Sequence, residues 1–265
     1  MTREHRARDN QARDYPAMVR PVAVEPVPRR VRAMLGGSVV LDTTAARYVW
    51  EWPNYPAYYI PLSDIRADFF IAGDRESTPW GTARRDGLQV GEVCRARCAW
   101  VYGDDAQPGL RDTARFEFSA LDAWYEEDEQ IFVHPRNPYT RVDALRSSRR
   151  IRVELNGTVL AESPAPVLLF ETGLPTRYYL SPVDVDFTHL VATDAVSECP
   201  YKGRTTGYWS VRLGGTLHDD LAWVYHYPTP AVSAIAGLIA FYNEQVDIVL
   251  DGQLLPRPTT HFFPS

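Results

Sequence analysis

The strongest constraint on the fold of this chain is an internal duplication. The word AWVY occurs at Ala99–Tyr102 and again at Ala222–Tyr225. The segment RRVRAMLGGSVVL, which begins at Arg29, returns at an offset of 120 residues as RRIRVELNGTVLA, which begins at Arg149. A unit of this size is large enough to fold around a core of its own. The sequence therefore predicts two homologous domains.

Both repeated segments have the pattern of antiparallel hairpins. Alternating apolar residues flank Gly36-Gly37 in the first copy and Asn156-Gly157 in the second, and such pairs supply the positive φ angles of a two-residue turn. A third hairpin is predicted to turn at Gly214-Gly215. Apolar residues at Ala231–Asn243, after two prolines, predict one helix, and Val246–Leu250 predicts a final strand. We therefore expect a mainly β fold of two small antiparallel domains, each with one helix.

The expected domain boundaries follow from changes in composition. The first domain is predicted at residues 29–138 and the second at residues 149–256. Residues 139–148 are polar and are expected to link the two domains. Residues 1–28 are rich in Pro and Arg and lack periodicity, so we expect a flexible N-terminal extension.

The composition argues against several classes of function. A net charge of -6 and a pI near 5.5 offer no basic face for nucleic acid. The longest weakly polar run, Ala231–Tyr242, is too short to span a bilayer, and no signal region is found, so we expect a cytoplasmic protein without membrane contact. The spacing of Cys94, Cys98 and Cys199 matches neither a disulfide framework nor a zinc site, and we predict no metal and no cofactor. The oligomeric state stays open.

One lysine stands out among the basic residues. Of 28 basic residues, 27 are arginine, and Lys202 is the only lysine. Positions that need only a positive charge have accepted Arg, so the exception indicates a site that needs a compact ammonium or an amine that can lose its proton. Lys202 lies in the loop word CPYKG, whose counterpart TPWG at Thr78–Gly81 has neither the Cys nor the Lys.

The second copy carries the words LLFETGLPTRYYL, CPYKG, YWSV, LAWVY and IAGLIAFYNEQVDIVLDG in this order, across Arg149–Gly252. In this it resembles the DUF427 family, a domain of unknown function. The first copy lacks several of these residues and is similar to a degenerate member of a tandem arrangement. The resemblance implies an antiparallel fold similar to the tent-like sheets of the Mss4-like group, without the zinc cysteines of that group.

The family has sometimes carried a nucleotidyltransferase label. That chemistry needs acidic residues on one strand, after a Gly-Ser turn, to hold magnesium. The candidate pair is Asp184 and Asp186, and no Gly-Ser turn precedes it. Asp residues commonly stabilise turns, so we interpret the pair as structural and disfavour nucleotidyltransferase activity.

Polar and aromatic residues gather in the motif words of the second copy, which is typical of a concave ligand pocket. Lys202, Cys199 and Glu171 are the candidate catalytic residues. An ammonium favours the thiolate of a neighbouring cysteine, and a carboxylate among aromatic rings can serve as an acid or a base. The candidate ligand-binding residues are Arg177, Tyr178, Tyr179, Tyr201, Tyr208, Trp223 and Tyr225.

Structural interpretations of the same residues stay open. Glu171 is equally suited to pair with Arg177 and serve the fold, and Trp209 and Trp223 are typical core residues.

Two hypotheses of function follow. In the first, the second domain binds a small anionic or carbonyl-bearing molecule, as an enzyme or a sensor, through Lys202 and Arg177. In the second, the chain is a non-catalytic structural or interaction protein, and the motif words serve the fold alone. Both copies keep AWVY, whereas the first lacks CPYKG. This asymmetry favours a site in the second domain.

Overall fold

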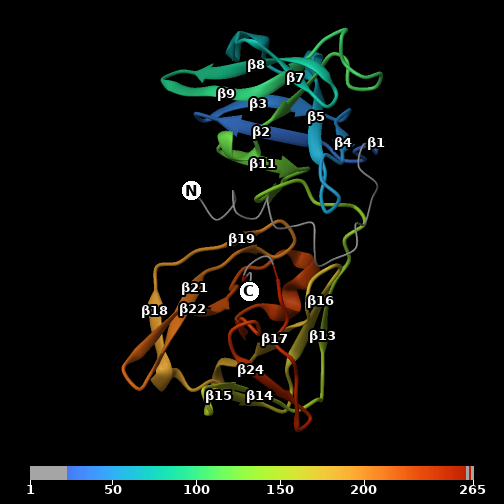
Figure 1. The fold of residues 1–265 in the computed structure, drawn as a ribbon. Helices are drawn as coiled ribbons and strands as arrows, with labels where there is room; N and C mark the ends of the chain where they lie inside the picture. Colours follow the sequence, from blue (N-terminus) through green and yellow to red (C-terminus); the bar gives the residue numbers. More distant parts are fainter. Residues whose placement is uncertain (1–22, 261–262, 264–265) are drawn as a thin grey trace. The chain divides into compact units, whose positions relative to one another are not determined.

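The computed structural model describes residues 23–260 and 263 (Figure 1). The chain divides into two compact units, one ending at Pro138 and the other beginning at Tyr139. Both are mainly β, and their strand pairs are antiparallel, as the hairpin patterns predict. The expected flexibility of the N-terminal extension lies, for residues 1–22, outside the described part of the chain.

The first unit contains an eight-stranded and a four-stranded sheet. The larger sheet has the order β1 (Val24–Pro26), β4 (Arg47–Val49), β5 (Ala57–Pro61), β10 (Thr113–Phe116), β9 (Val93–Tyr102), β8 (Gly81–Val90), β6 (Phe70–Ile71), and β7 (Arg75–Thr78) also pairs with β8. The smaller sheet has the order β12 (Glu129–Ile131), β11 (Ala123–Glu126), β2 (Val31–Leu35), β3 (Ser38–Thr43). Two 3-10 helices, η1 (Leu62–Asp64) and η2 (Ala67–Phe69), lie between β5 and β6, and η3 (Phe118–Ala120) connects β10 of the larger sheet to β11 of the smaller one.

The second unit repeats this plan. Its seven-stranded sheet has the order β13 (Val142–Arg146), β16 (Val167–Glu171), β17 (Arg177–Leu180), β23 (Ile239–Phe241), β22 (Thr216–Val224), β21 (Gly207–Leu213), β18 (Leu190–Thr193). The four-stranded sheet has the order β15 (Thr158–Ser163), β14 (Ile151–Leu155), β24 (Asp247–Leu250), β25 (Gln253–Leu254). A small ribbon of β19 (Glu198–Cys199) and β20 (Gly203–Arg204) and the 3-10 helices η4 (Pro182–Asp184), η5 (Phe187–His189) and η6 (Pro230–Ile235) complete it.

The predicted hairpin turns are confirmed. Gly36 and Gly37 join β2 to β3 with φ angles of 56° and 75°. Asn156 and Gly157 join β14 to β15 with φ angles of 50° and 80°. Positive φ at both central positions matches the turn to the twist of the flanking strands, which is why these residue pairs identified the hairpins.

The helix predicted at Ala231–Asn243 is wrong beyond its first residues. The 3-10 helix η6 ends at Ile235, and Gly237 follows in the left-handed region with a φ of 72°. Ile239–Phe241 then forms β23, which lies inside the seven-stranded sheet between β17 and β22. A strand buried on both faces has an apolar run without alternation, and such a run also fits a buried helix. Between β9 and β10, the counterparts of β22 and β23, the described chain of the first unit forms turns and no helix.

The expected linker and extension also contribute strands. Within residues 139–148, Val142–Arg146 forms β13 and pairs with β16 along the edge of the seven-stranded sheet. Within residues 1–28, Val24–Pro26 forms β1 and pairs with β4 in the same way. Edge strands of this kind are short and polar, so their composition resembles that of a linker.

The seven-stranded sheet is buried on both faces. Tyr178 and Leu180 face the core that β14 and β24 complete, whereas Tyr179 points to the opposite face. On that opposite face η6 contributes Val232 and Ile235 to a second cluster. Because side chains alternate along a strand, neighbours such as Tyr178 and Tyr179 serve separate environments. Among residues 23–260 and 263, no helix has the length and apolar character needed to cross a membrane.

Candidate functional site

Most of the predicted site residues meet on the η6 face of the seven-stranded sheet. Strands β17, β21 and β22 place Tyr179, Tyr208 and Trp223 there in one buried cluster, which Tyr225 joins just after β22. The β19–β20 ribbon adds Cys199 and Lys202, and the turn of this ribbon is anchored where the Thr229 hydroxyl donates to the Tyr201 carbonyl over 2.6 Å. Tyr178 is the exception, because it lies on the opposite face of the sheet.

Lys202 forms a buried ion pair with Glu171, the last residue of β16. The two side chains are 11% and 6% exposed. Burial opposes the charge of Lys202, but the neighbouring Cys199, Glu171 and Tyr179 outweigh it and raise the pKa of the amine. The amine therefore stays protonated at neutral pH, and it acts as a cation and hydrogen-bond donor rather than as a nucleophile.

Hydrogen-bond donors remain available around this ion pair. An ammonium carries three N–H donors, and among the described residues Glu171 is the one hydrogen-bond acceptor of Lys202. The Tyr179 hydroxyl accepts from the Trp223 indole nitrogen over 3.4 Å and keeps its own proton to donate. Burial raises the pKa of Tyr179 to about 12 despite the Lys202 ammonium nearby, so this phenol is neutral. Tyr225, also buried, has Cys199 and Tyr179 as electrostatic neighbours.

The surroundings of Cys199 disfavour the thiolate that the sequence suggested. Burial raises the pKa of the thiol, and this effect outweighs the Lys202 ammonium and the backbone amides of Tyr201 and Lys202. A thiolate is the nucleophilic form of cysteine. At neutral pH this thiol is protonated, so a nucleophilic role for Cys199 stays a prediction that its environment does not support.

Arg177 pairs with Glu244, and not with Glu171 as the structural interpretation had it. Its Nη1 and Nη2 atoms donate to the Glu244 carboxylate over 2.5 and 2.6 Å, and Nη1 also donates to Asn243. Thr260 donates to the same carboxylate over 2.7 Å. Burial raises the pKa of Glu244, but the hydrogen bonds from Arg177 and Thr260 prevail and hold it below its ordinary value.

Sequence reasoning missed Asn243, Glu244 and Tyr242. The available signal is the polar pair Asn243-Glu244, which interrupts the apolar run between β23 and β24. The Tyr242 ring lies 4.3 Å from that of Trp223, and its hydroxyl is 3.0 Å from that of Tyr208.

In the first unit a different residue supplies the positive charge beside the corresponding carboxylate. The strand registers place Arg115 where the second unit has Ala240, because Arg115 pairs with Tyr59 and Ala240 pairs with Tyr179. Arg115 donates to Glu51, the counterpart of Glu171, over 3.1 Å. Both units therefore need a cation beside this carboxylate. In the first unit it comes from a sheet strand, and in the second it comes from a loop.

The remaining aspartates have structural roles. Asp184 accepts from the Ser163 hydroxyl over 2.6 Å, and Asp186 accepts from the backbone amide of Thr188 at the start of η5. This agrees with their interpretation as turn residues. Within the described ranges, no group of three or more His, Cys, Asp or Glu is arranged to hold a metal ion.

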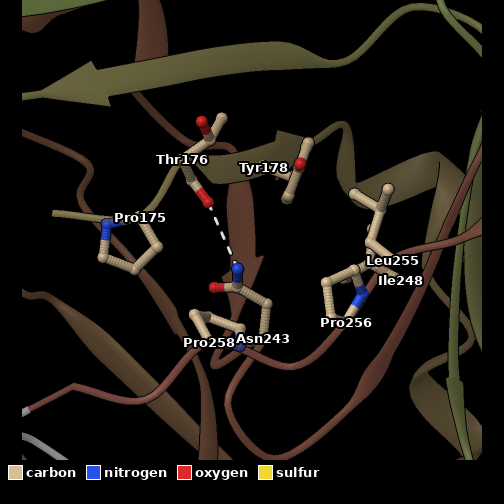
Figure 2. A pocket seen from close by; sticks show the side chains of 8 residues that line it. All are labelled: Pro175, Thr176, Tyr178, Asn243, Ile248, Leu255, Pro256 and Pro258. Atoms are coloured by element: carbon tan, nitrogen blue, oxygen red, sulfur yellow. Dashed lines mark hydrogen bonds between the residues drawn. The ribbon is translucent and has the colours of Figure 1, made fainter.

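A cavity of about 200 Å³ lies on the other face of the sheet, at Tyr178 (Figure 2). It is lined by Pro175, Thr176, Tyr178, Asn243, Ile248, Leu255, Pro256 and Pro258. The Asn243 amide donates to the Thr176 carbonyl over 3.3 Å among these side chains. Lys202, Cys199 and Glu171 are not part of its wall.

Comparison with known proteins agrees with the duplication. No curated protein matched the chain. The sequence profile of one family matches it twice, over residues 23–127 and 143–252, so that each of the two units is covered by one match. The chain therefore belongs to the family described as Domain of unknown function (DUF427), of which it contains two tandem copies.

Proposed function

We propose that the second domain binds a small molecule that carries a carboxylate or a carbonyl group, and that Lys202 is the residue that recognises it. The observation that carries this proposal is the buried ammonium, of which one hydrogen-bond acceptor, Glu171, is found among the described residues. Leaving buried donors without acceptors costs free energy, and an oxygen of a ligand would remove that cost.

The neighbours of Lys202 support the same class of ligand. The hydroxyl of Tyr179 is neutral and directed among these groups, and Tyr225 lies beside it. A carbonyl or carboxylate oxygen accepts from such donors and offers none in return. Trp223 and Tyr208 add aromatic walls, while Arg177 is held by Glu244 and supports the cluster from one side. Tyr201 keeps the ribbon in place through its carbonyl.

The proposed role of Lys202 is binding and polarisation. A protonated amine stabilises negative charge on a ligand oxygen but does not attack a carbonyl carbon. With Cys199 as a protonated thiol and Glu171 engaged in the ion pair, the geometry supports a binding protein or sensor more than a covalent catalyst.

The single lysine makes the proposal directly testable. Protein labelled with ¹⁵N at lysine Nζ gives one ammonium resonance from the full chain, because Lys202 is the only lysine. We expect titration with acetate, benzoate or acetophenone to shift this resonance saturably for at least one of them. Benzene is the matched compound without an oxygen and should leave the resonance in place.

A matched variant separates binding from folding. Arg115→Met removes the cation of Glu51 in the first domain, the counterpart of the Lys202 pair, and it should leave the ligand titration unchanged. If none of the three oxygen-bearing compounds shifts the Lys202 resonance, the proposal fails. The structural hypothesis is then preferred, and it already has the support that both domains pair this carboxylate with a cation.

We also propose that each domain is a variant of the tent-like Mss4-like fold. The support is that each combines a large antiparallel sheet with a four-stranded one around a common core. An experimental structure of either domain would test this assignment by superposition.

A further inference from the structure

The side chain of Tyr178 is mostly buried, but its hydroxyl bonds with no other residue of the described chain. The residue is 8% exposed, and its hydroxyl has no hydrogen-bond partner among the described residues. It lines the cavity of about 200 Å³ on the face of the sheet opposite to Lys202. The hydroxyl is not among the buried atoms that lack a partner, so water reaches it, and a molecule that enters the cavity can reach it as well.

The first domain shows how the same tyrosine is satisfied by the fold alone. Its counterpart, Tyr58, donates to the Glu126 carboxylate over 2.6 Å. The Tyr58 ring packs against Trp124 at a centroid distance of 5.8 Å and stacks on Tyr48 at 5.7 Å. The space around Tyr58 is therefore filled, and its hydroxyl has an acceptor.

The second domain replaces each of these neighbours by a smaller or apolar side chain. The strand registers place Ile248 where the first domain has Trp124, and Leu250 where it has Glu126. Leu168 likewise stands at the position of Tyr48. Two aromatic rings and a hydrogen-bond acceptor are thus removed from the surroundings of one retained tyrosine.

The cavity has the chemistry of a small-molecule site. Figure 2 shows Thr176 and Tyr178 along one side and Pro256 and Pro258 along the other, with the Asn243 amide between Thr176 and Pro258. Proline and aliphatic side chains make most of the wall, and a few polar groups stand among them. Mostly apolar walls with a few orienting groups are typical of ligand sites, and a cavity of about 150 Å³ suffices for benzene.

We propose that this cavity is a second ligand site, which takes a single-ring aromatic molecule bearing one oxygen substituent. The ring occupies the space that Trp124 fills in the first domain, and the oxygen substituent bonds with the Tyr178 hydroxyl as the Glu126 carboxylate does with Tyr58. This site lies on the opposite face of the sheet from Lys202, and it does not depend on the function proposed for that residue.

The probe is 4-fluorophenol, with fluorobenzene as the matched compound that lacks the oxygen. Binding to the full chain is followed through the ¹⁹F resonance of the probe. We expect saturable binding of 4-fluorophenol, weakened about 2- to 10-fold in Tyr178→Phe, the range that one net hydrogen bond supplies. Binding of fluorobenzene should be equal in the wild type and in Tyr178→Phe.

A second variant fills the cavity. Ile248→Trp introduces the tryptophan that the first domain has at this position, and it should abolish the binding of both probes. The matched control is Tyr58→Phe in the first domain, which should leave the binding of both probes unchanged. If Ile248→Trp does not fold, Tyr178→Phe decides alone. Absence of saturable 4-fluorophenol binding to the wild type overturns the proposal, as does equal affinity in Tyr178→Phe. The Lys202 ammonium resonance should not move during this titration, which keeps the two sites distinguishable.

Discussion

Loss of Glu244 should destabilise the second domain far more than loss of a surface acid. Glu244 and Arg177 have side chains only 2% and 9% exposed and share two charge-assisted hydrogen bonds. Replacing Glu244 by Gln keeps the shape but leaves the guanidinium buried without a counter-charge. Removing one partner of a buried pair costs about 3–5 kcal/mol, and we expect a value in this range.

The same pair predicts strong coupling in a double variant. Arg177→Met combined with Glu244→Met removes both charges and leaves no unpaired ion, so its cost should fall below the sum of the two single variants by about 1–3 kcal/mol. The first domain supports this expectation, because it has Ala57 at the position of Arg177 and still builds the same sheet.

Hydrogen exchange measured by mass spectrometry is the appropriate assay. It reports the opening free energy of peptides in β17 and β23 separately from those of the first domain, which matters because a two-domain chain need not unfold in one step. Arg66→Met, which breaks the mostly exposed pair with Asp68, is the matched control and should cost less than about 1 kcal/mol. A cost of the same size for Glu244→Gln, or full additivity in the double variant, would refute the reasoning.

Three further predictions concern other groups. The folded-state pKa of Glu244 lies below the ordinary value of 4.5. Its carboxylate therefore stabilises the second domain fully above pH 4.5, and this stabilisation is lost as the pH falls through the folded-state pKa. Measured against pH, the opening free energy should show this acid loss in the wild type and not in Glu244→Gln. Iodoacetamide at pH 8 should label exposed Cys94 well before Cys199, whose thiol is protonated by burial, and equal rates in peptide mapping would contradict this. Tyr58→Phe removes a bond to a buried carboxylate and should cost about 1–3 kcal/mol, whereas Tyr178→Phe, without ligand, should cost less than about 0.5; equal costs by hydrogen exchange would show that the two hydroxyls are not differently satisfied.

The hairpins and the duplication could be predicted because their signals are local. Gly36-Gly37 and Asn156-Gly157 determine their turns through backbone angles alone. The strand at Ile239–Phe241 could not be distinguished from a helix, because an apolar run buried on two faces has no informative period. Short edge strands such as Val142–Arg146 turn only two small apolar residues, Val142 and Ala144, toward the core, and therefore resembled a linker.

The sequence predicted several of the residues that come together in the candidate site, but not which of them form ion pairs. Tyr179 and Trp223 do lie on one face of a sheet, as the alternation along each strand allows, and Lys202 approaches Tyr179 from the turn between β19 and β20. The choice of Lys202 rather than Arg177 as the partner of Glu171 depends on where a loop returns to the sheet, and no local pattern encodes that. Tyr178 was grouped with Tyr179, although adjacent residues of a strand face opposite ways.

The two sources of positive charge beside the shared carboxylate have a mechanical consequence. In the first domain Arg115 belongs to β10, so the charge of Glu51 stays balanced whatever the surrounding loops do. In the second domain the β19–β20 ribbon carries the balancing charge, and moving the ribbon away would leave the largely buried Glu171 carboxylate without a counter-charge. The ion pair thus opposes any movement of the ribbon away from β16. Replacing Ala240 by Arg would place a positive charge on the sheet, as Arg115 does in the first domain. Glu171 would then keep a counter-charge even when the ribbon moves away.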